Sequence, residues 1–320
     1  MSMLSSWLAA APPDAAVEIA PEGVAVAVLG SRGRELVIQA YGMAALPPGA
    51  VQPSLTGHNI ADKAAVAAAV AAACEQAGVR PRRVALLIPD PAVRVSLVRF
   101  DSVPARRDDL EQLMLWQLRK SAPFPIEDGV VSYTPGAAGP GGREFVVEVA
   151  RRDVVREYEE ACEAQGMHAG LVDLPTLSVV NLFLSGDAAP AGDWLVVHMR
   201  PGYTSIALMR GPDLIFFRSR AEGEAELLED VVHQTAMYYE DRLEGRGFAR
   251  VLLGGHGHGP GSVDAARRSL EARLGTRVET IDPTQAAAPV DRITVTPALT
   301  AALAPLVGVL LRGQREVVGA

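Results

Sequence analysis

Two stretches of the 320-residue chain repeat the same order of strands and turns. In the first half, a turn string at residues 20–23 splits an apolar run, residues 16–29, into a hairpin, and residues 35–41 supply a third strand. The second half shows the same strands and turn, at residues 194–199, 200–203, 205–209 and 213–218. Because a chain of this length exceeds what one hydrophobic core usually spans, the repeat predicts two lobes that each open with a three-stranded unit.

Helices are expected between and after these units, so the chain is predicted to be α/β with mixed sheets. The main expected helices lie at residues 61–76, 151–165, 175–184, 226–243 and 298–311. Residues 186–192, with the sequence GDAAPAG, are small, turn-rich and without periodicity, so we place the lobe boundary there. The predicted parts are an N-terminal tail (residues 1–15), a first lobe (16–186) and a second lobe (187–320).

Composition excludes several classes of protein. The formal net charge of −8 argues against nucleic acid or an anionic membrane surface as a main partner. The longest apolar run, residues 298–311, contains Pro305 and Gly308 and is too short for a membrane span. The first residues lack the basic and long apolar segments of a signal peptide, and Cys74 and Cys162 are expected to be free thiols. We therefore expect a soluble cytoplasmic protein without direct membrane insertion.

The stretch QLMLWQLRKSAPFPIEDGVVSY, residues 112–133, is the most distinctive local sequence. It begins as a helix whose leucines, methionine and Trp116 cover more than one face, which predicts packing on two sides. Pro123 and Pro125 end this helix, because proline lacks an N–H and restricts the residue before it. Phe124 is held between the two prolines as a stiff apolar projection, and an apolar strand follows. Residues 134–142, with the sequence TPGAAGPGG, are then expected to form a hairpin loop.

The stretch thus contains a helix ending in Trp, then a basic residue, then the string APFPIED before an apolar strand. In this order it resembles the PilM family of type IV pilus assembly proteins. The segments VEVARRDVVREYEEACEAQGMHAGLVDL, LLGGHG and ALAPLVGVLLRG are also similar to parts of that family, so the resemblance runs nearly end to end. The resemblance implies a duplicated actin/hexokinase-like (ribonuclease H-like) fold, with mixed sheets flanked by helices in each lobe. It also implies a PilM-type extra subdomain at about residues 81–171 and a reduced upper subdomain in the second lobe.

The same resemblance places a degenerate nucleotide cleft between the lobes. Its positions fall on Glu18, Arg200, Gly202, Thr204, Gly254, Gly255 and Gly257. The first turn keeps a carboxylate at Glu18 but has Pro21, which offers no amide donor to a phosphate. The second turn has lost its carboxylate and has Arg200 where the family has glycine. Two interpretations stay open: Arg200 or His198 still binds an anion, or the phosphate pocket is filled. We expect no ATP hydrolysis, and ATP or Mg²⁺ is implied by the family alone.

Two histidines close to the glycine-rich loop, His256 and His258, are too few to predict a metal site without acidic or cysteine partners. No catalytic triad can be assigned by spacing, so no catalytic residue is predicted.

The resemblance implies a partner rather than a substrate. PilM proteins receive the short N-terminal cytoplasmic segment of PilN, an inner-membrane protein, and through it contact the assembly platform and motor. We expect Trp116, Phe124 and Pro125 to line the docking site, and we expect the protein to be recruited peripherally to the inner membrane through this partner. Two alternatives remain: a working nucleotide-dependent switch resting on Glu18, Thr204 and Gly254-Gly255, or the cytoplasmic actin-like domain of a type II secretion L-type protein.

Overall fold

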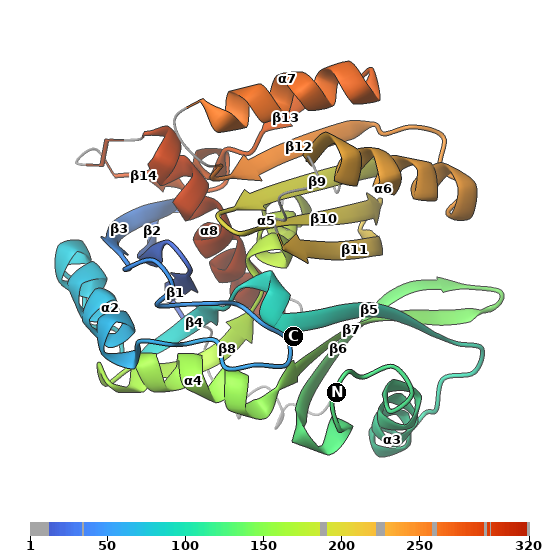
Figure 1. Cartoon of the computed structure of the whole chain (residues 1–320), viewed down its shortest axis with the longest axis horizontal. Helices are drawn as coiled ribbons and strands as arrows, with labels where there is room; N and C mark the ends of the chain where they lie inside the picture. The colour runs from blue at the N-terminus through green and yellow to red at the C-terminus, as the bar shows by residue number, and fades with distance from the viewer. Residues whose placement is uncertain are drawn as a thin grey trace.

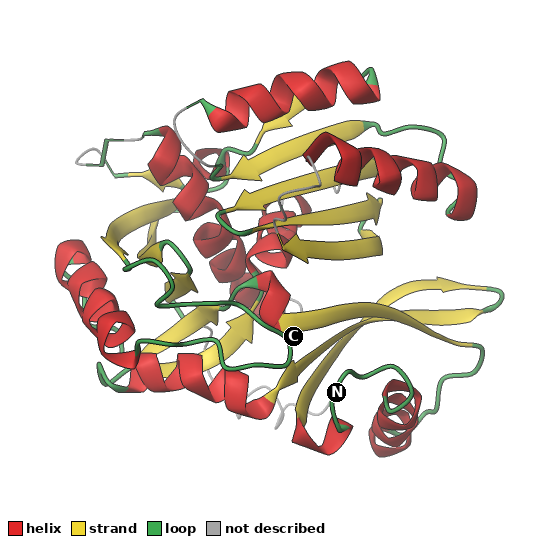
Figure 2. Ribbon diagram, viewed as in Figure 1, coloured by secondary structure: helices red, strands yellow, loops and turns green. Residues whose placement is uncertain are grey.

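The computed structural model describes residues 13–33, 35–185, 191–221, 228–257, 261–290, 293–294 and 296–318; for residue 229 and residues 313–318 it describes the backbone alone. The described residues form three sheets with helices packed around them (Figures 1 and 2). Two of the sheets face each other across a layer of helices, and the third projects from the first lobe.

The first sheet has six strands in the order β14-β3-β2-β1-β4-β8. Its strands are β1 (Ala15–Ala20), β2 (Gly23–Arg32), β3 (Glu35–Ala45), β4 (Arg83–Leu87), β8 (His168–Asp173) and β14 (Ala288–Pro289). The hairpin predicted from the turn string is present, because β1 pairs antiparallel with β2 up to Ala20 opposite Gly23. β4 then pairs parallel with β1, and β8 pairs parallel with β4, which leaves β8 at one edge of the sheet.

The second sheet repeats this arrangement, in the order β11-β10-β9-β12-β13. Its strands are β9 (Asp193–Arg200), β10 (Tyr203–Arg210), β11 (Asp213–Ala221), β12 (Arg250–Gly255) and β13 (Val278–Thr280). β9, β10 and β11 form an antiparallel meander, and β12 pairs parallel with β9, as β4 does with β1. The predicted repeat of a hairpin plus a third strand is therefore confirmed.

The third sheet belongs to a subdomain inserted between β4 and β8. It contains β5 (Val93–Phe100), β6 (Gly129–Gly139) and β7 (Gly142–Arg151) in the order β5-β7-β6, and α3 (Arg107–Leu118) lies beside it (Figure 1). The insertion is narrower than the expected range of residues 81–171, because β4 and β8 belong to the first sheet. It leaves β6 at the edge of its sheet.

Two expectations for this subdomain were wrong. Residues 134–142 were expected to be a loop, but β6 and β7 stay paired down to Gly139 opposite Gly142, with a register shift between Pro135 and Ala138. The shift accommodates the proline, which cannot donate to the ladder. The helix α3 is packed on one side and not two: Met114 and Leu118 are buried, whereas Trp116 is 53% exposed. Among the described residues, the buried side chains of α3 pack with the three-stranded sheet and with Ile126.

The remaining helices flank the sheets and lie between them. They are α2 (Lys63–Ala77), α4 (Arg152–Glu163), α5 (Pro175–Leu184), α6 (Leu228–Arg242), α7 (Ser262–Leu274) and α8 (Pro297–Val318). Short 3₁₀ turns are η1 (Asp90–Ala92), η2 (Ile126–Asp128) and η3 (Pro283–Gln285). Gly78 ends α2 in the left-handed conformation, with φ of 68°, as its position in the sequence predicts. Among the described residues, no helix is both long and apolar enough to cross a membrane.

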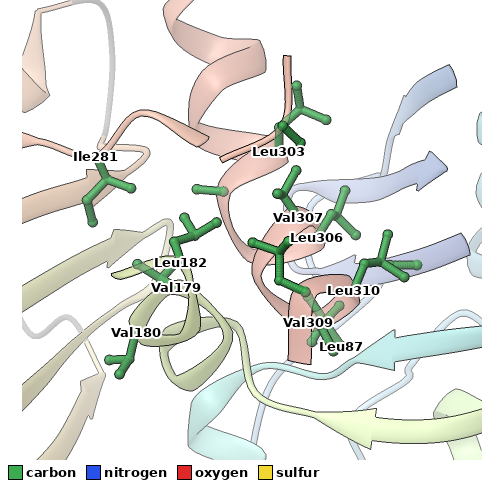
Figure 3. Packing of buried hydrophobic residues seen from close by; sticks show 14 of the residues in the cluster. Leu87, Val179, Val180, Leu182, Ile281, Leu303, Leu306, Val307, Val309 and Leu310 are labelled. Atoms are coloured by element: carbon green, nitrogen blue, oxygen red, sulfur yellow. The ribbon is translucent and has the colours of Figure 1, made fainter. Parts of the chain in front are cut away.

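Helices α5 and α8 form the core between the two large sheets. Figure 3 shows Val179 and Leu182 of α5 turned toward Leu303, Leu306 and Val307 of α8. The backbones approach closely, since a Cβ added at Gly308 would lie 1.8 Å from the carbonyl oxygen of Ser178. Residues 187–320 were assigned to the second lobe, but β14 pairs with β3 of the first sheet and α8 packs against both lobes. The end of the chain therefore ties the lobes together.

Candidate functional site

The two hairpin turns of the repeat meet between the lobes, and an arginine joins them. Arg200 ends β9, and its Nη2 atom lies 2.8 Å from Oε1 of Glu18 and 2.9 Å from Oε1 of Glu22. Glu18 is on β1 and Glu22 is in the turn that follows it, so both ion pairs cross from the second lobe to the first. The side chains of Arg200 and Glu18 are only 3% and 2% exposed. The guanidinium thus occupies the space between the two turns.

A second polar bridge runs beside this ion pair and is centred on Asp90. Asp90 lies in η1, directly after β4, and one of its oxygens accepts hydrogen bonds from Thr176 Oγ1 (2.5 Å) and Ser205 Oγ (2.7 Å). Thr176 starts α5 in the first lobe, whereas Ser205 lies on β10 in the second. The Thr176 hydroxyl is also 2.9 Å from Nδ1 of His198. Thr176 has a single hydroxyl proton, which it donates to Asp90. In the contact with His198, we therefore assign the proton to Nδ1 of the histidine, which donates to the Thr176 oxygen.

Burial dominates the electrostatics of this cleft. It raises the pKa of Glu18 to about 7, against the opposing effect of Arg200. It also raises the pKa of Asp90, although hydrogen bonds from Thr176 and Ser205 oppose this. Burial lowers the pKa of His198 well below its ordinary value, with Arg200 acting in the same direction. For Arg200, burial favours the neutral form, but Glu18 and Glu22 outweigh it and raise its pKa. Arg200 therefore stays charged.

The glycine-rich loop after β12 is shaped by contacts with the protein itself. Gly255 has φ of 96°, and a Cβ there would lie 1.9 Å from the carbonyl oxygen of Met199. A Cβ at Gly254 would lie 2.7 Å from Ile281, and one at Gly257 would lie 2.4 Å from the Ser262 hydroxyl. Packing against neighbouring strands and the start of α7 thus explains why each of these positions is glycine.

The structure brings together some of the residues predicted for the nucleotide cleft. Glu18 and Arg200 are in direct contact, and Thr204 is buried on β10 opposite Met199 of β9. Gly202 forms the second turn with φ of 89°. No group of three or more His, Cys, Asp or Glu that could hold a metal occurs in the described part of the chain, and His258 lies outside it.

The sequence analysis missed Glu22, Asp90, Thr176 and Ser205. One signal could have found Asp90: it follows the short, wholly apolar strand β4, and the carboxyl end of such a strand is where ligands and catalytic groups gather in α/β folds.

A second candidate site is an open groove in the first lobe. It has a volume of about 1020 Å³ and lies between β8 and the inserted three-stranded sheet, with α4 along one side. Residues 170–174 of β8 and its end, together with Val130 and Ser132 of β6, contribute to its lining. β8 and β6 are both edge strands of their sheets. The groove is therefore bordered by two strands that can each accept another strand.

Two of the carboxylates that line this groove, Asp173 and Glu148, differ in their partners. Asp173, at the end of β8, is buried and accepts a hydrogen bond of 2.7 Å from Arg312 Nη1 of α8. Glu148, on the central strand β7, is partly buried, and no described side chain forms a hydrogen bond or ion pair with it. Burial raises the pKa of Glu148 to about 8, and the neighbouring Asp173 carboxylate adds to this, while Arg312 opposes it.

The residues predicted to receive a partner lie beside the groove rather than inside it. Phe124 packs against the core between α3 and the three-stranded sheet, and a Cβ on Gly129 would touch its ring. Pro125 precedes η2, whose last residues Glu127 and Asp128 line the groove. Trp116 is on the outer face of α3, where the Lys120 ammonium lies 4.0 Å from its ring centre. Phe124 and Pro125 thus position one rim of the groove.

Known proteins share this architecture. Among solved structures, the fold is similar to a PilM-PilN type IV pilus biogenesis complex, with a TM-score of 0.80 and 18% identity over 94% of this chain and 98% of that chain. A Bacteroides thetaiotaomicron protein with an actin-like ATPase fold and unknown function has a TM-score of 0.49 and 9% identity, over 90% of this chain and 95% of that one. The cytoplasmic domain of EpsL, an inner-membrane component of the Vibrio cholerae type II secretion system, has a TM-score of 0.48 and 12% identity, over 75% and 80%.

The predicted two-lobed α/β fold with mixed sheets is confirmed by the sheet order and by the fold shared with the PilM-PilN complex. None of the curated proteins matches the sequence. The family of type IV pilus assembly protein PilM matches residues 16–246, which is more than half of the chain. The chain therefore belongs to the PilM family of type IV pilus assembly proteins.

Proposed function

We propose that this protein is a scaffold of type IV pilus assembly that binds the N-terminal cytoplasmic segment of a PilN-like inner-membrane protein in the first-lobe groove, without hydrolysing ATP. The observation that carries this proposal is the contrast between the groove and the interlobe cleft: among the described residues, two edge strands border the groove, whereas Arg200 occupies the cleft. In the cell, the protein would be cytoplasmic and recruited to the inner membrane through its partner. The structural neighbour, described as a PilM-PilN complex, supports the choice of partner.

The groove suits an extended peptide. An edge strand offers unpaired N–H and C=O groups, and a peptide added to it gains backbone hydrogen bonds, while side-chain pockets give specificity. Val93, Val130, Leu171 and Val172 supply apolar lining for alternate peptide side chains. Val130 is 38% exposed, so its side chain is accessible to a peptide that lies in the groove.

The interlobe cleft suits Mg-ATP poorly. Pro21 and Pro201 remove amide donors from both turns, and Glu18 is already engaged by Arg200. A nucleotide would have to break this buried ion pair. Leaving one partner of such a pair buried without its counter-charge costs about 3–5 kcal/mol. Two guanidinium nitrogens of Arg200, Nε and Nη1, have no hydrogen-bond partner among the described residues, so a small anion is the second candidate ligand.

A peptide-binding experiment tests the scaffold proposal. A labelled peptide with the first residues of the PilN-like protein from the same genome would be titrated with the wild type, with Val130→Arg and with Met43→Arg. Both substitutions place a charge on an apolar strand residue that is about equally exposed, 38% for Val130 and 39% for Met43, but only Val130 lines the groove. We expect Val130→Arg to weaken binding at least tenfold and Met43→Arg to leave it unchanged. No binding to the wild type, or equal effects of the two variants, would refute the groove.

Calorimetry with Mg-ATP, Mg-ADP and inorganic phosphate tests the cleft. We expect dissociation constants weaker than about 1 mM for both nucleotides, which corresponds to a binding free energy of about −4 kcal/mol or less in magnitude. Low-micromolar ATP binding that is lost in Thr204→Val would show that the site works as a nucleotide switch. Binding of phosphate alone that is lost in Arg200→Gln would identify an anion site.

A further inference from the structure

The groove contains one partly buried carboxylate, Glu148, that forms no ion pair or hydrogen bond with a described side chain. Glu148 sits at the middle of the three-stranded sheet, opposite Ser132 of β6 and Val95 of β5. Neither neighbour carries a charge. The side chain is partly buried and lines the groove, and no described residue donates a hydrogen bond to it. A carboxylate in such a position is costly unless it is protonated or meets a cation.

Most of the other charged side chains around the groove already have a partner among the described residues. From β8, Asp173 is engaged by Arg312 of α8. On α4 and the residue before it, Arg151 pairs with Asp153 and Arg156 with Glu159, while Arg152 donates to the carbonyl oxygen of Gly129. At the η2 rim, Glu127 pairs with Arg119, and the neighbouring Asp128 is exposed to solvent. Among the described side chains, Asp173 and Glu148 have one cation beside them, Arg312, which bonds to Asp173.

We propose that Glu148, with Asp173 beside it, receives a cationic group of the bound peptide, either a Lys or Arg side chain or the peptide's α-amine. This inference rests on the proposed function of the groove and names the chemistry that its partner must present. A peptide cation placed here gives the two carboxylates one positive charge each. The net charge of −8 on the chain favours the approach of such a peptide.

Occupation of this position changes the protonation of Glu148. With a pKa of about 8, only about one-tenth of the Glu148 side chains are ionised at pH 7 in the free protein. A cation stabilises the ionised form, so the carboxylic acid gives up its proton to the buffer as the ammonium or guanidinium takes its place. One peptide therefore binds and about one proton leaves. Affinity must then rise with pH below about 8 and become constant above it, if the cation is Lys or Arg.

The test measures affinity from pH 6.5 to 9 for the wild type, Glu148→Gln and Glu144→Gln. Glu144 lies on the same strand but pairs with Arg99 outside the groove, which makes it the matched control. With the PilN-like peptide as probe, we expect the association constant of the wild type and of Glu144→Gln to rise more than about tenfold between pH 6.5 and 8.5. Glu148→Gln should bind more weakly at pH 8.5 and show no such rise. Because Gln resembles the protonated acid, its melting temperature at pH 7 should stay within about 2 °C of the wild type.

Two further arms identify the cation and separate this inference from the proposed function. Calorimetry at pH 7 in two buffers of different ionisation enthalpy should show about one proton released by the wild type and none by Glu148→Gln. A second series of titrations uses peptides in which each Lys or Arg is replaced by Gln in turn, and a peptide whose N-terminus is acetylated. The change that removes the group bound by Glu148 should abolish the pH dependence, which identifies that group. An α-amine would also make affinity fall again above pH 8.

Peptide binding without pH dependence, or with affinity that falls as pH rises from 6.5 to 8, would overturn the inference and leave the groove intact. Absence of binding at every pH would overturn the proposed function itself.

Discussion

The interlobe cleft and the first-lobe groove both contain carboxylates, but the protein satisfies them differently. In the cleft, Glu18 and Glu22 meet Arg200 from the opposite lobe, and Asp90 accepts from Thr176 and Ser205 on the two sides. In the groove, Glu148 has no such partner among the described residues. A ligand of the cleft would have to break an existing buried ion pair, which is costly, whereas Glu148 is open to a new cation. We therefore expect the cleft to hold the lobes together as a clamp and, under the proposed function, the groove to receive the partner as its receptor.

The largest effect expected from this contrast follows Arg200→Ala. Removing the guanidinium leaves Glu18 and Glu22 without a counter-charge between the lobes, and breaking a buried pair typically costs about 3–5 kcal/mol. Urea unfolding at pH 7 measures the loss. The control is Arg119→Ala, which removes an exposed pair with Glu127 and should cost less than about 1 kcal/mol. A wild-type unfolding midpoint for Arg200→Ala would show that the cleft is not a clamp.

A pH series sharpens the same test through Glu18. Its pKa is about 7 in the folded protein and 4.5 as the reference for the unfolded chain, so the folded state binds more protons between these values. The contribution of Glu18 to stability is therefore greatest below pH 4.5 and falls as pH rises toward 7. Glu18→Gln does not titrate, so its unfolding free energy relative to the wild type should increase from pH 5 to pH 8. A difference that does not change with pH would mean that Arg200 keeps Glu18 ionised throughout.

The next effect in size concerns the helices beneath the cleft. Gly308→Ala adds a methyl group where α8 meets the backbone of α5, 1.8 Å from the Ser178 oxygen, and overpacking of this kind costs about 1–3 kcal/mol. Alanine favours a helix over glycine by about 1 kcal/mol, so the two effects oppose each other. A lower melting temperature would show that the lobes are held rigidly at this contact. A higher one would show that α5 and α8 can separate, and that the clamp at Arg200 carries most of the interlobe stability.

A smaller effect is expected at α4, the helix along the groove. The Glu157 carboxylate accepts hydrogen bonds from the backbone N–H groups of Asn59 and Ile60 and contacts His58, which holds residues 58–60 against this helix. Burial alone would raise its pKa, but these hydrogen bonds and His58 lower it. A lowered pKa contributes stability above about pH 4.5 that is lost as pH falls through the folded value. Glu157→Gln should therefore cost about 1–2 kcal/mol at pH 7 and much less at pH 4, measured by urea unfolding at both pH values.

The fold could be predicted from the sequence further than the sites could. The repeated turn strings with their flanking strands determine the two sheets, because strand patterns and proline-containing turns are local properties. The pairing of β6 with β7 beyond Pro135 was missed because it depends on a register shift. The amphipathic side of α3 was missed because its neighbour, a single sheet, is known only from the tertiary structure.

The sites depend on residues far apart in the chain. The sequence marked Arg200 as an anomaly, but its contacts with Glu18 and Glu22 span about 180 positions and follow from how the two lobes face each other. The groove lies between β8 of the first sheet and the inserted three-stranded sheet, so Glu148 and Asp173 come from different sheets and share no local motif. Of the residues that were not predicted, Asp90 alone has a local signal in the sequence. It directly follows a buried strand, which is a position where ligands and catalytic groups gather in α/β folds.

The smallest effect is expected at Trp116, and it decides where the boundary of the receptor lies. Trp116 was predicted to contact the partner, but it is half exposed on the outer face of α3 and does not line the groove. Its visible interaction is with Lys120, and an exposed cation–π contact contributes about 0.5–1 kcal/mol. Trp116→Ala should therefore lower the free energy of unfolding by less than about 1 kcal/mol and change peptide affinity by less than about twofold, in the same titration used for Val130→Arg.

Phe124→Ala is the matched comparison, because its ring packs in the core of the subdomain. We expect this substitution to lower the free energy of unfolding more than it lowers peptide affinity. Loss of peptide binding in a fully folded Trp116→Ala variant would instead extend the receptor from the groove around η2 to α3. The unpaired strand edges would then be only part of the surface that the partner contacts.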